Sequence, residues 1–347
     1  MNEEGARRRA TVHDVARQAG VSLATVDRVL NGRPGVRPAT AEKVDAAIRE
    51  IGFQRDLGAS LLARARDLKL TFVLPGGTNE FMGNLADAIS RRADGALLNR
   101  VHIETRRVPP LDAQALAQAL DALDPRSCDC AIVVGSEAAS VTAAVNNAVR
   151  RGIVVMTLVS DLPATQRRHF IGIDNHAAGR TAASLMGRFL PGGGKVAVIA
   201  GSLHLRDHSD RLAGFRAVLD GQFPGVKIIG PAEGHDERSE TGALVEQLLA
   251  RHSDLKGIYN LGAGNGGLVT ALDAASRPGA LRVICHELTE PTRRGLQSGV
   301  IDIVLDQNPD GEIREAIAVA RTLALGNSGI VTGDPIEIGI FLRDNLR

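Results

Sequence analysis

The sequence has 347 residues, of which 44% are apolar and 23% charged, and its formal net charge is +1; this composition is typical of globular proteins and excludes disordered and fibrous classes. No apolar run reaches the roughly 20 residues that a bilayer span needs, and the first residues, MNEEGARRRA, are charged, so we expect a cytoplasmic protein without a membrane partner. The three cysteines, Cys128, Cys130 and Cys285, form neither an even disulfide framework nor a C-x-x-C metal pair, which predicts reduced thiols and no metal site.

Charge is unevenly distributed along the chain. Residues 1–69 contain 13 Lys and Arg against 9 Asp and Glu, a net of +4, and the remaining 278 residues contain 28 against 31, a net of −3. This asymmetry favours a small basic domain that meets phosphates, attached to a larger and nearly neutral body.

The stretch TVHDVARQAGVSLATVDRVLNG predicts two short helices. Apolar residues recur at helical spacing from Val12 to Ala19, and Thr11 is placed as the N-cap of this first helix. Gly20 ends it, and Ser22 offers the N-cap of a second helix. Two short helices around a glycine-containing turn predict a helix-turn-helix unit, whose second helix enters the major groove of DNA.

Two neighbouring features favour DNA binding over a helical hairpin within a larger core. Residues 38–51 predict a third helix with an apolar stripe, and Arg7, Arg8 and Arg9 precede the unit as a basic arm. A helical hairpin alone is more often structural, but the combination with a third helix and a basic arm is typical of a DNA-binding domain.

With these residues the chain resembles the lactose-repressor (LacI/GalR) family of transcription regulators. The matching residues are the stretch above, Val36, Thr40, and the residues up to Gly52 and Phe53. The resemblance implies that the second helix reads DNA, with Arg28 as the best candidate for a bidentate guanine contact. By this resemblance, the residues that read bases are Leu23, Ala24 and Arg28, and the residues that contact phosphates are Ser22, Thr25 and Asn31.

Asp27 departs from the family pattern, which usually has Ser at this position. A carboxylate near phosphates is repelled unless it accepts a hydrogen bond from a cytosine amine or pairs with Arg28. We include Asp27 in the predicted DNA-binding set with both alternatives open.

The stretch GFQRDLGASLLARARD follows the third predicted helix, and Asp56 is placed to cap a short helix in it. An ordinary linker is the alternative. The resemblance implies a hinge that becomes helical only on operator DNA, in which Leu62 is the residue that enters the minor groove and kinks the duplex. Gly58 and Ala59 weaken such a helix in isolation, which fits folding coupled to binding.

From Leu70 onward, strand-like apolar runs alternate with helical stretches. This alternation predicts an α/β fold with parallel sheets covered by helices, and a second start near Lys195 indicates two similar doubly wound lobes. The strand-like runs are LKLTFVLP, CAIVVG, IVVMTLV, KVAVIAG, GIYNL, LRVICHE and IDIVLDQ.

Ligands of such folds bind outside the carboxyl ends of the strands, so the polar residues that follow each strand form the candidate site. This set is rich in groups that both donate and accept hydrogen bonds, which suits a polyhydroxylated ligand such as a sugar or polyol. With no Trp and one Tyr in the chain, Phe81 is the main candidate to stack on a sugar face. The predicted effector-binding residues are Asn79, Phe81, Asp161, Arg211, His235, Asn265, Glu287 and Gln307.

The body is also similar to the periplasmic sugar-binding proteins, through TNEFM, FIGIDNHAAGRTAA, SDRLAGFRAVL, EGHDERSE and IDIVLDQNPD. The resemblance implies a homodimeric repressor that binds a pseudo-palindromic operator and responds to a small effector. Glu287 replaces the Asp usual there, and Asp161 is shifted by two residues from the usual acid. The predicted units are a DNA-binding domain of residues 1–54, a hinge of 55–69, and a two-lobed body of 70–347, with lobe 1 at about 70–173 and 308–336 and lobe 2 at about 174–307 and 337–347.

Enzymatic alternatives have weaker support. Gly262, Gly264 and Gly267 match the dinucleotide motif G-x-G-x-x-G, but a nicotinamide enzyme carries this motif in the first strand-helix unit of its binding domain. We therefore interpret it as a late strand-to-helix turn and expect no cofactor. The group His204, Asp207, His208 and Asp210 is interpreted as a polar surface or ligand loop. An NAD-dependent or other enzyme and a free solute-binding protein remain the alternative classes.

Overall fold

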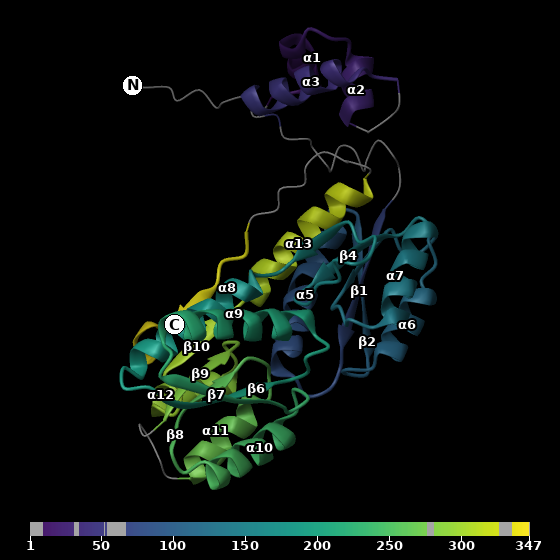
Figure 1. The fold of residues 1–347 in the computed structure, drawn as a ribbon. Helices are drawn as coiled ribbons and strands as arrows, with labels where there is room; N and C mark the ends of the chain where they lie inside the picture. The colour runs from purple at the N-terminus through teal and green to yellow at the C-terminus, as the bar shows by residue number, and fades with distance from the viewer. Residues whose placement is uncertain are drawn as a thin grey trace, which may run out of the picture.

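The computed structural model describes residues 10–30, 35–51, 53, 67–275, 281–325 and 335–346. They form a small helical unit followed by a two-lobed α/β body (Figure 1). None of the helices in these ranges has the length and apolar character needed to span a bilayer.

The N-terminal unit contains three helices, which confirm the helices predicted from the sequence. Their bounds are α1 Val12–Ala19, α2 Leu23–Leu30 and α3 Pro38–Ile51. Thr11 and Asp14 form a reciprocal capping box at the start of α1, and Gly20 ends that helix in the left-handed conformation with φ 65°. Val15, Val26 and Val44, one from each helix, are fully buried and form the centre of the small core.

The first lobe is built on a five-stranded parallel sheet of order β2-β1-β3-β4-β5. Helices α5 and α13 cover one face and helices α6 and α7 the other, and each face has its own apolar core. The elements are β1 Leu68–Pro75, α5 Glu80–Leu98, β2 Val101–Val108, α6 Ala113–Asp121, β3 Cys130–Val133, α7 Ala139–Arg150, β4 Val154–Leu158, β5 His169–Ile171 and α13 Pro309–Ala324.

The second lobe is built on a six-stranded sheet of order β11-β10-β9-β8-β6-β7, in which only the β10–β11 pair is antiparallel. Helices α8 and α9 pack on one face, and α10, α11 and α12 on the other. The elements are α8 Asn175–Phe189, β6 Gly194–Ala200, α9 Arg206–Gln222, β7 Val226–Glu233, α10 Arg238–Arg251, β8 Leu255–Asn260, α11 Asn265–Ala274, β9 Arg282–His286, α12 Glu290–Ser298, β10 Ile303–Asp306, β11 Gly339–Phe341 and the 3₁₀ turn η1 Arg343–Asn345.

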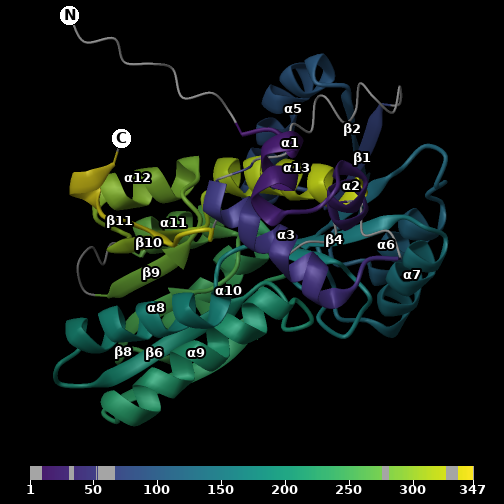
Figure 2. The ribbon, with the colours of Figure 1, turned by 90° about the horizontal axis from the view of Figure 1, so that it is seen from above.

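The chain passes between the lobes more than once. It leaves the first sheet after β5, and α13 returns from β10 to pack on the first sheet, whereas β11 pairs with β10 in the second. The two views in Figures 1 and 2 show the resulting separation into two lobes. Several segments of the chain therefore connect the two lobes.

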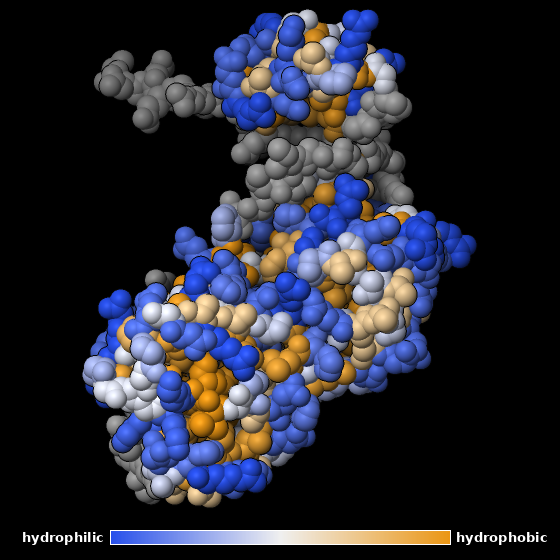
Figure 3. All heavy atoms as spheres, in the orientation of Figure 1, coloured by the Kyte–Doolittle hydropathy of each residue, from blue (hydrophilic) through white to orange (hydrophobic). Residues whose placement is uncertain are grey.

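The surface of the body is largely hydrophilic in the view of Figure 3, with apolar residues gathered over one part of the second lobe. The interior contains all three cysteines as free, buried thiols, and Cys130 is the first residue of β3.

Candidate functional site

The second helix of the N-terminal unit presents its polar face to solvent. Ser22 Oγ accepts a hydrogen bond from Thr25 N at 3.1 Å and so caps α2, while Val26 is fully buried. Leu23 is 42% exposed, an unusual position for leucine on a small domain. The exposed residues of α2 and its cap include Ser22, Leu23, Ala24, Asp27 and Arg28. Asn31 and Leu62, the other two residues predicted to bind DNA, lie outside the described residues, as does the arm of three arginines.

A cavity with an enclosed volume of about 70 Å³ is lined by residues of both lobes. Its lining follows the carboxyl ends of β1, β2, β3 and β4 in the first lobe and of β6, β7, β8, β9 and β10 in the second. This is where a doubly wound α/β fold binds ligands. The cavity is therefore the candidate effector site.

Strained backbone is concentrated around this cavity. Among the described residues, seven other than glycine have positive φ, and five of these seven line the cavity. They are Leu111 (φ 56°), Val159 (65°), His235 (50°), Asp236 (59°) and Glu287 (70°). A left-handed conformation is costly for leucine and most of all for β-branched valine, and such strain clusters at ligand-binding sites. The observation supports a binding role for the cavity.

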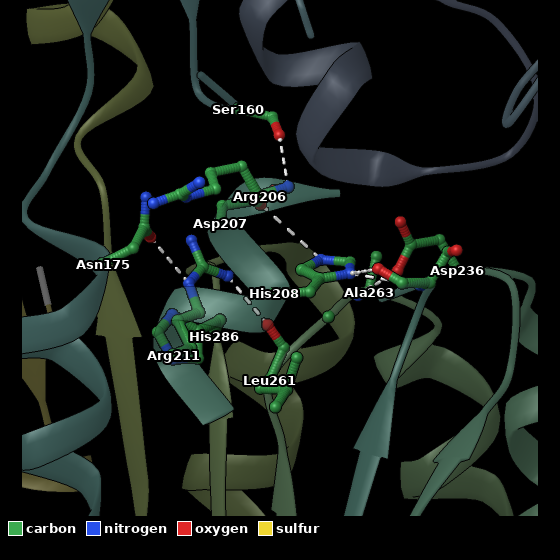
Figure 4. Close-up of polar contacts among 12 residues, drawn as sticks. Ser160, Asn175, Arg206, Asp207, His208, Arg211, Asp236, Leu261, Ala263 and His286 are labelled. Atoms are coloured by element: carbon green, nitrogen blue, oxygen red, sulfur yellow. Dashed lines mark hydrogen bonds and ion pairs between the residues drawn. The ribbon is translucent and has the colours of Figure 1, made fainter. Parts of the chain in front are cut away.

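Arg211 is the centre of the polar end of the cavity (Figure 4). Its guanidinium is 1% exposed; Nε donates to Asn175 Oδ1 and Nη1 to the carbonyl oxygen of Leu261, both at 2.8 Å. The position of Arg211 depends on a very close approach of α8 and α9. Gly179 on α8 permits this approach, because a Cβ there would lie 2.0 Å from the Arg211 carbonyl oxygen on α9. Only glycine at that position lets Asn175 and Arg211 meet.

Glu287 and Gln307 complete this end of the cavity. Gln307 Nε2 donates to Glu287 Oε1 at 2.6 Å, and Arg211 Nη2 lies 3.8 Å from the same oxygen. Burial raises the pKa of Glu287 to about 8, although the Arg211 charge opposes this shift. The neighbouring His286 is buried, and its Nε2 shares a hydrogen bond with Tyr259 Oη. Burial and the nearby charge of Arg211 lower the pKa of His286 well below its usual range.

Several buried polar atoms at this end have no hydrogen-bond partner in the protein. They are Asp207 Oδ1, Arg211 Nη2, Glu287 Oε2 and Gln307 Oε1. Buried polar atoms are normally paired, and unpaired ones are costly. Four such atoms belong to residues that line one cavity, and groups of this kind suit a ligand that carries several hydroxyl groups.

The structure places six of the eight predicted effector-binding residues on the cavity wall: Asn79, Phe81, Arg211, His235, Glu287 and Gln307. Asn79 also caps α5, because its Oδ1 accepts from Phe81 N and Met82 N. His235 lies at the mouth and pairs with Glu240 at 2.6 Å, a hydrogen bond that raises the pKa of this histidine.

The other two predicted residues, Asp161 and Asn265, do not line the cavity. Asp161 is turned toward its own lobe, where its carboxylate accepts from Thr157 Oγ1 at 2.6 Å and pairs with Arg167. Asn265 is 2% exposed; its Oδ1 accepts from Asn260 and its Nδ2 donates to the carbonyl oxygen of His286. Asn265 thus fixes the backbone behind Glu287, and a role in contacting the ligand directly does not fit this geometry.

The glycine-rich turn before α11 serves packing within the protein. A Cβ on Gly267 would lie 1.8 Å from the carbonyl oxygen of Arg238, and a Cβ on Gly264 would lie 2.1 Å from Thr241 Oγ1. These glycines let α11 approach α10. Gly262 lines the cavity but is confined by Gly201 N and Asp236.

Asp207 and His208 line the cavity and lie in the first turn of α9, where Asp207 is 5% and His208 3% exposed. The prediction of a loop is therefore wrong for these two residues, whereas their place at the cavity agrees with the predicted position near a ligand. His208 Nδ1 accepts from Ser202 N at 3.2 Å. No cluster of three or more metal-ligating side chains is found in the part of the chain that the structure describes. Asp236 and Glu237, also on the wall, belong to the stretch EGHDERSE.

Direct contacts join the two lobes around the cavity. Ser160 Oγ accepts from Arg206 N at 3.0 Å (Figure 4), and Arg206 Nη1 pairs with Glu137 at 3.1 Å. A third contact joins Thr78 of the first lobe to Glu237 of the second, where Thr78 Oγ1 donates to Glu237 Oε2 at 2.7 Å. The structure therefore has its lobes closed on each other.

Two family models match the chain. Residues 70–328 match the model described as "Periplasmic binding protein domain", and residues 11–56 match "Bacterial regulatory proteins, lacI family". The two matches correspond to the two-lobed body and to the helical N-terminal unit.

Known proteins are similar to one or both parts. Catabolite control protein A of Priestia megaterium is 40% identical over 79 residues, 23% of this chain and 24% of that protein. The transcriptional regulator GalS of Salmonella typhimurium is 25% identical over 263 residues, 73% of each chain. The first regulator thus shares only about a quarter of its length with this chain.

A solved structure is similar to the body. An ABC transporter solute-binding protein from Burkholderia graminis, crystallised in complex with D-arabinose, aligns with a TM-score of 0.75 and 26% identity, covering 81% of this chain and 97% of that one. The likeness confirms the two-lobed architecture expected from the sequence.

Proposed function

Because the chain belongs to the periplasmic binding protein domain family and carries the N-terminal module of the bacterial lacI-family regulators, we propose that it is a ligand-responsive, DNA-binding transcriptional regulator. The observation that carries the proposal is the presence of both modules in one chain. A solute-binding protein acting alone has no use for an exposed recognition helix.

The regulator binds duplex DNA through α2 as a homodimer on a pseudo-palindromic operator. Leu23, Ala24 and Arg28 read base edges, with Arg28 donating two hydrogen bonds to a guanine, and Ser22 and Thr25 contact phosphates. Asp27 and Arg28 are both exposed, and the two predicted roles of Asp27, accepting from a cytosine amine or pairing with Arg28, are kept as alternatives. The residues outside the described ranges, Asn31 and Leu62, have the phosphate and minor-groove roles that the family resemblance implies.

The effector is a sugar or polyol bound between the lobes. Support comes from Asp207, Arg211, Glu287 and Gln307, which line the cavity and have buried polar atoms without a hydrogen-bond partner, and from the similarity to a protein solved with D-arabinose. Phe81, 4% exposed, supplies an aromatic surface on the first lobe.

Ligand and DNA binding are linked through lobe closure. A ligand that contacts both lobes favours the closed arrangement, in which Ser160, Glu137 and Thr78 meet the second lobe. Closure changes how the two subunits of the dimer meet and so changes the spacing of the hinges at residues 55–69. The ligand acts only through its different affinity for the open and closed states.

Selection of DNA sites from a random duplex library by the purified full-length protein tests this proposal. We expect a palindromic consensus, binding that weakens steeply with salt, and a change of affinity when the effector is added. The matched control is Val26→Asp, which disrupts the core of the N-terminal unit and should eliminate selection while the body still binds its ligand. Failure of the intact protein to enrich any site would refute the proposal.

A further inference from the structure

The two lobes contribute different chemistry to the cavity. On the side of the second lobe, the wall consists mostly of charged and polar groups, and three of them, Asp207, Arg211 and Glu287, are at least 94% buried. Their unpaired atoms, with that of Gln307 at the lobe crossover, define the end where hydroxyl groups of a ligand are bound.

The first lobe presents an apolar wall. Its members follow β2, β3 and β4 and are Val108, Pro109, Pro110, Leu111, Val134 and Val159. Three polar side chains of this lobe already use an oxygen as acceptor: Asp112 Oδ1 accepts from Ala115 N, Ser160 Oγ accepts from Arg206 N, and Asn79 Oδ1 accepts from Phe81 N and Met82 N. Ser136 is a further polar residue of this side. Away from Ser136 and the donor groups of Asn79 and Ser160, this side offers apolar surface.

Val159 is the most informative residue of this wall. It follows β4, is 2% exposed, and has φ 65°. Asparagine adopts this conformation far more readily than a β-branched residue does. Val159 also packs in the apolar core of the first lobe, which accounts for a valine at this position. Leu111 on the same wall has φ 56° and is 39% exposed, so it is the apolar residue of the wall with the larger surface open to a ligand.

We propose that the effector is a sugar or polyol that bears an apolar group, either a deoxygenated carbon or an alkyl or aryl substituent, on the side opposite its bound hydroxyls. This inference rests on the proposed function, because it takes the cavity to be the effector site. The hydroxyls bind at Asp207, Arg211, Glu287 and Gln307, and the apolar group packs on the wall of the first lobe.

The preference follows from the different costs of burial. A hydroxyl group turned toward the apolar wall loses water and gains no hydrogen-bond partner, which is unfavourable. A CH₂ or CH₃ group in the same place gains from the removal of its surface from water, by about fourfold in affinity for each group buried. The lobes are closed around the cavity and shield the wall from solvent. This shielding increases both the cost of a buried hydroxyl group and the gain from a buried alkyl group.

Matched pairs of compounds that differ only in the apolar group test the proposal. The probes are D-galactose with D-fucose, D-ribose with methyl β-D-ribopyranoside, and D-arabinose with its methyl and phenyl pyranosides. Dissociation constants are measured by calorimetry on the full-length protein. We expect the apolar member of at least one pair to bind at least fourfold more tightly than its parent.

Two wall variants connect this preference to the first lobe. Val159→Asn and Leu111→Asn place an amide at positions whose backbone suits asparagine, and Leu111 is 39% exposed, so its replacement preserves folding even if Val159→Asn does not. Each variant should bring the ratio of the two dissociation constants in the preferred pair close to one. The control Leu98→Asn changes a leucine that is 88% exposed at the end of α5 and should leave the ratio unchanged.

The outcomes separate this inference from the proposed function. Equal or tighter binding of the parent sugars, a ratio that neither wall variant alters, or no binding by any compound would overturn the inference about the ligand. Operator selection by the same preparation is measured independently, and its failure would instead overturn the assignment of the chain as a DNA-binding regulator.

Discussion

Replacement of Glu287 by glutamine should remove a pH-dependent destabilisation of the body. Burial raises the pKa of this carboxyl from 4.5 to about 8 in the folded protein. Between these pH values the folded state holds the proton and the unfolded state releases it, so the free energy of unfolding falls as pH rises. Each pH unit in this window costs about 1.4 kcal/mol, and the wild-type protein should lose about 5 kcal/mol relative to Glu287→Gln by pH 8.

Urea unfolding of both proteins at several pH values between 4.5 and 8.5 measures this difference. The amide retains the side-chain shape and a hydrogen-bonding partner for Gln307, and it cannot ionise. Glu246→Gln is the control, because Glu246 is exposed on α10. The unfolding free energy of this variant should change with pH as that of the wild type does. A constant difference between wild type and Glu287→Gln across the window would refute the assignment of a neutral Glu287.

Arg28→Ala should weaken operator binding by about 1–3 kcal/mol and relax selectivity at one base position in a binding-site selection, whereas Arg49→Ala, which removes the same charge from exposed α3, should keep the selectivity. Val26→Ala removes fully buried methyl groups from a small core and should destabilise the N-terminal unit by about 2 kcal/mol in thermal unfolding, without changing ligand affinity. Arg211→Ala should abolish ligand binding in calorimetry while operator affinity without ligand stays near that of the wild type, and a variant that still responds would contradict the site. Gly267→Ala forces a Cβ to 1.8 Å from the Arg238 carbonyl oxygen and should destabilise the second lobe by more than about 2 kcal/mol in urea unfolding.

The helices of the N-terminal unit were predictable because their signals are local. Thr11, Gly20 and Ser22 cap or end helices through contacts within a few residues, and the apolar stripe of α3 has the helical period. The same locality explains the correct prediction of the buried strands β1 and β6, which are continuous apolar runs.

Strands at the sheet edges were missed for a physical reason. β2 reads VHIETRRV and β7 reads VKIIGPAE; both lie at the edge of their sheets and are partly exposed, so polar residues interrupt the apolar pattern. The short strands β5 and β11, of three residues each, carry too few positions for a period to be recognised. Their place is set by pairing with neighbours distant in the sequence.

The candidate site was predictable as a region, because the ends of parallel strands meet at one edge of a sheet. Which side chain turns into the cavity depended on partners that no local pattern reveals. Asp161 follows a strand as expected, yet Arg167 and Thr157 hold its carboxylate within the first lobe. Asn265 likewise is taken by Asn260 and by the backbone of His286. Conversely, Asp207 was predicted to lie in a loop. Its place in the first turn of a helix depends on α9 beginning at Arg206, which no local pattern reveals.

The position of Gln307 explains how a ligand in the cavity can act on the arrangement of the lobes. Gln307 is joined to Glu287 in the second lobe, and it directly precedes Asn308, the N-cap of α13, which packs on the first sheet. The first turn of α13 is in turn fixed to the first lobe by the ion pair of Asp310 with Arg92 on α5. A ligand that completes the hydrogen bonds of Gln307 therefore contacts a segment by which the chain passes from one lobe to the other. Its binding energy then differs between the open and closed states, which is the condition for a ligand to shift that equilibrium.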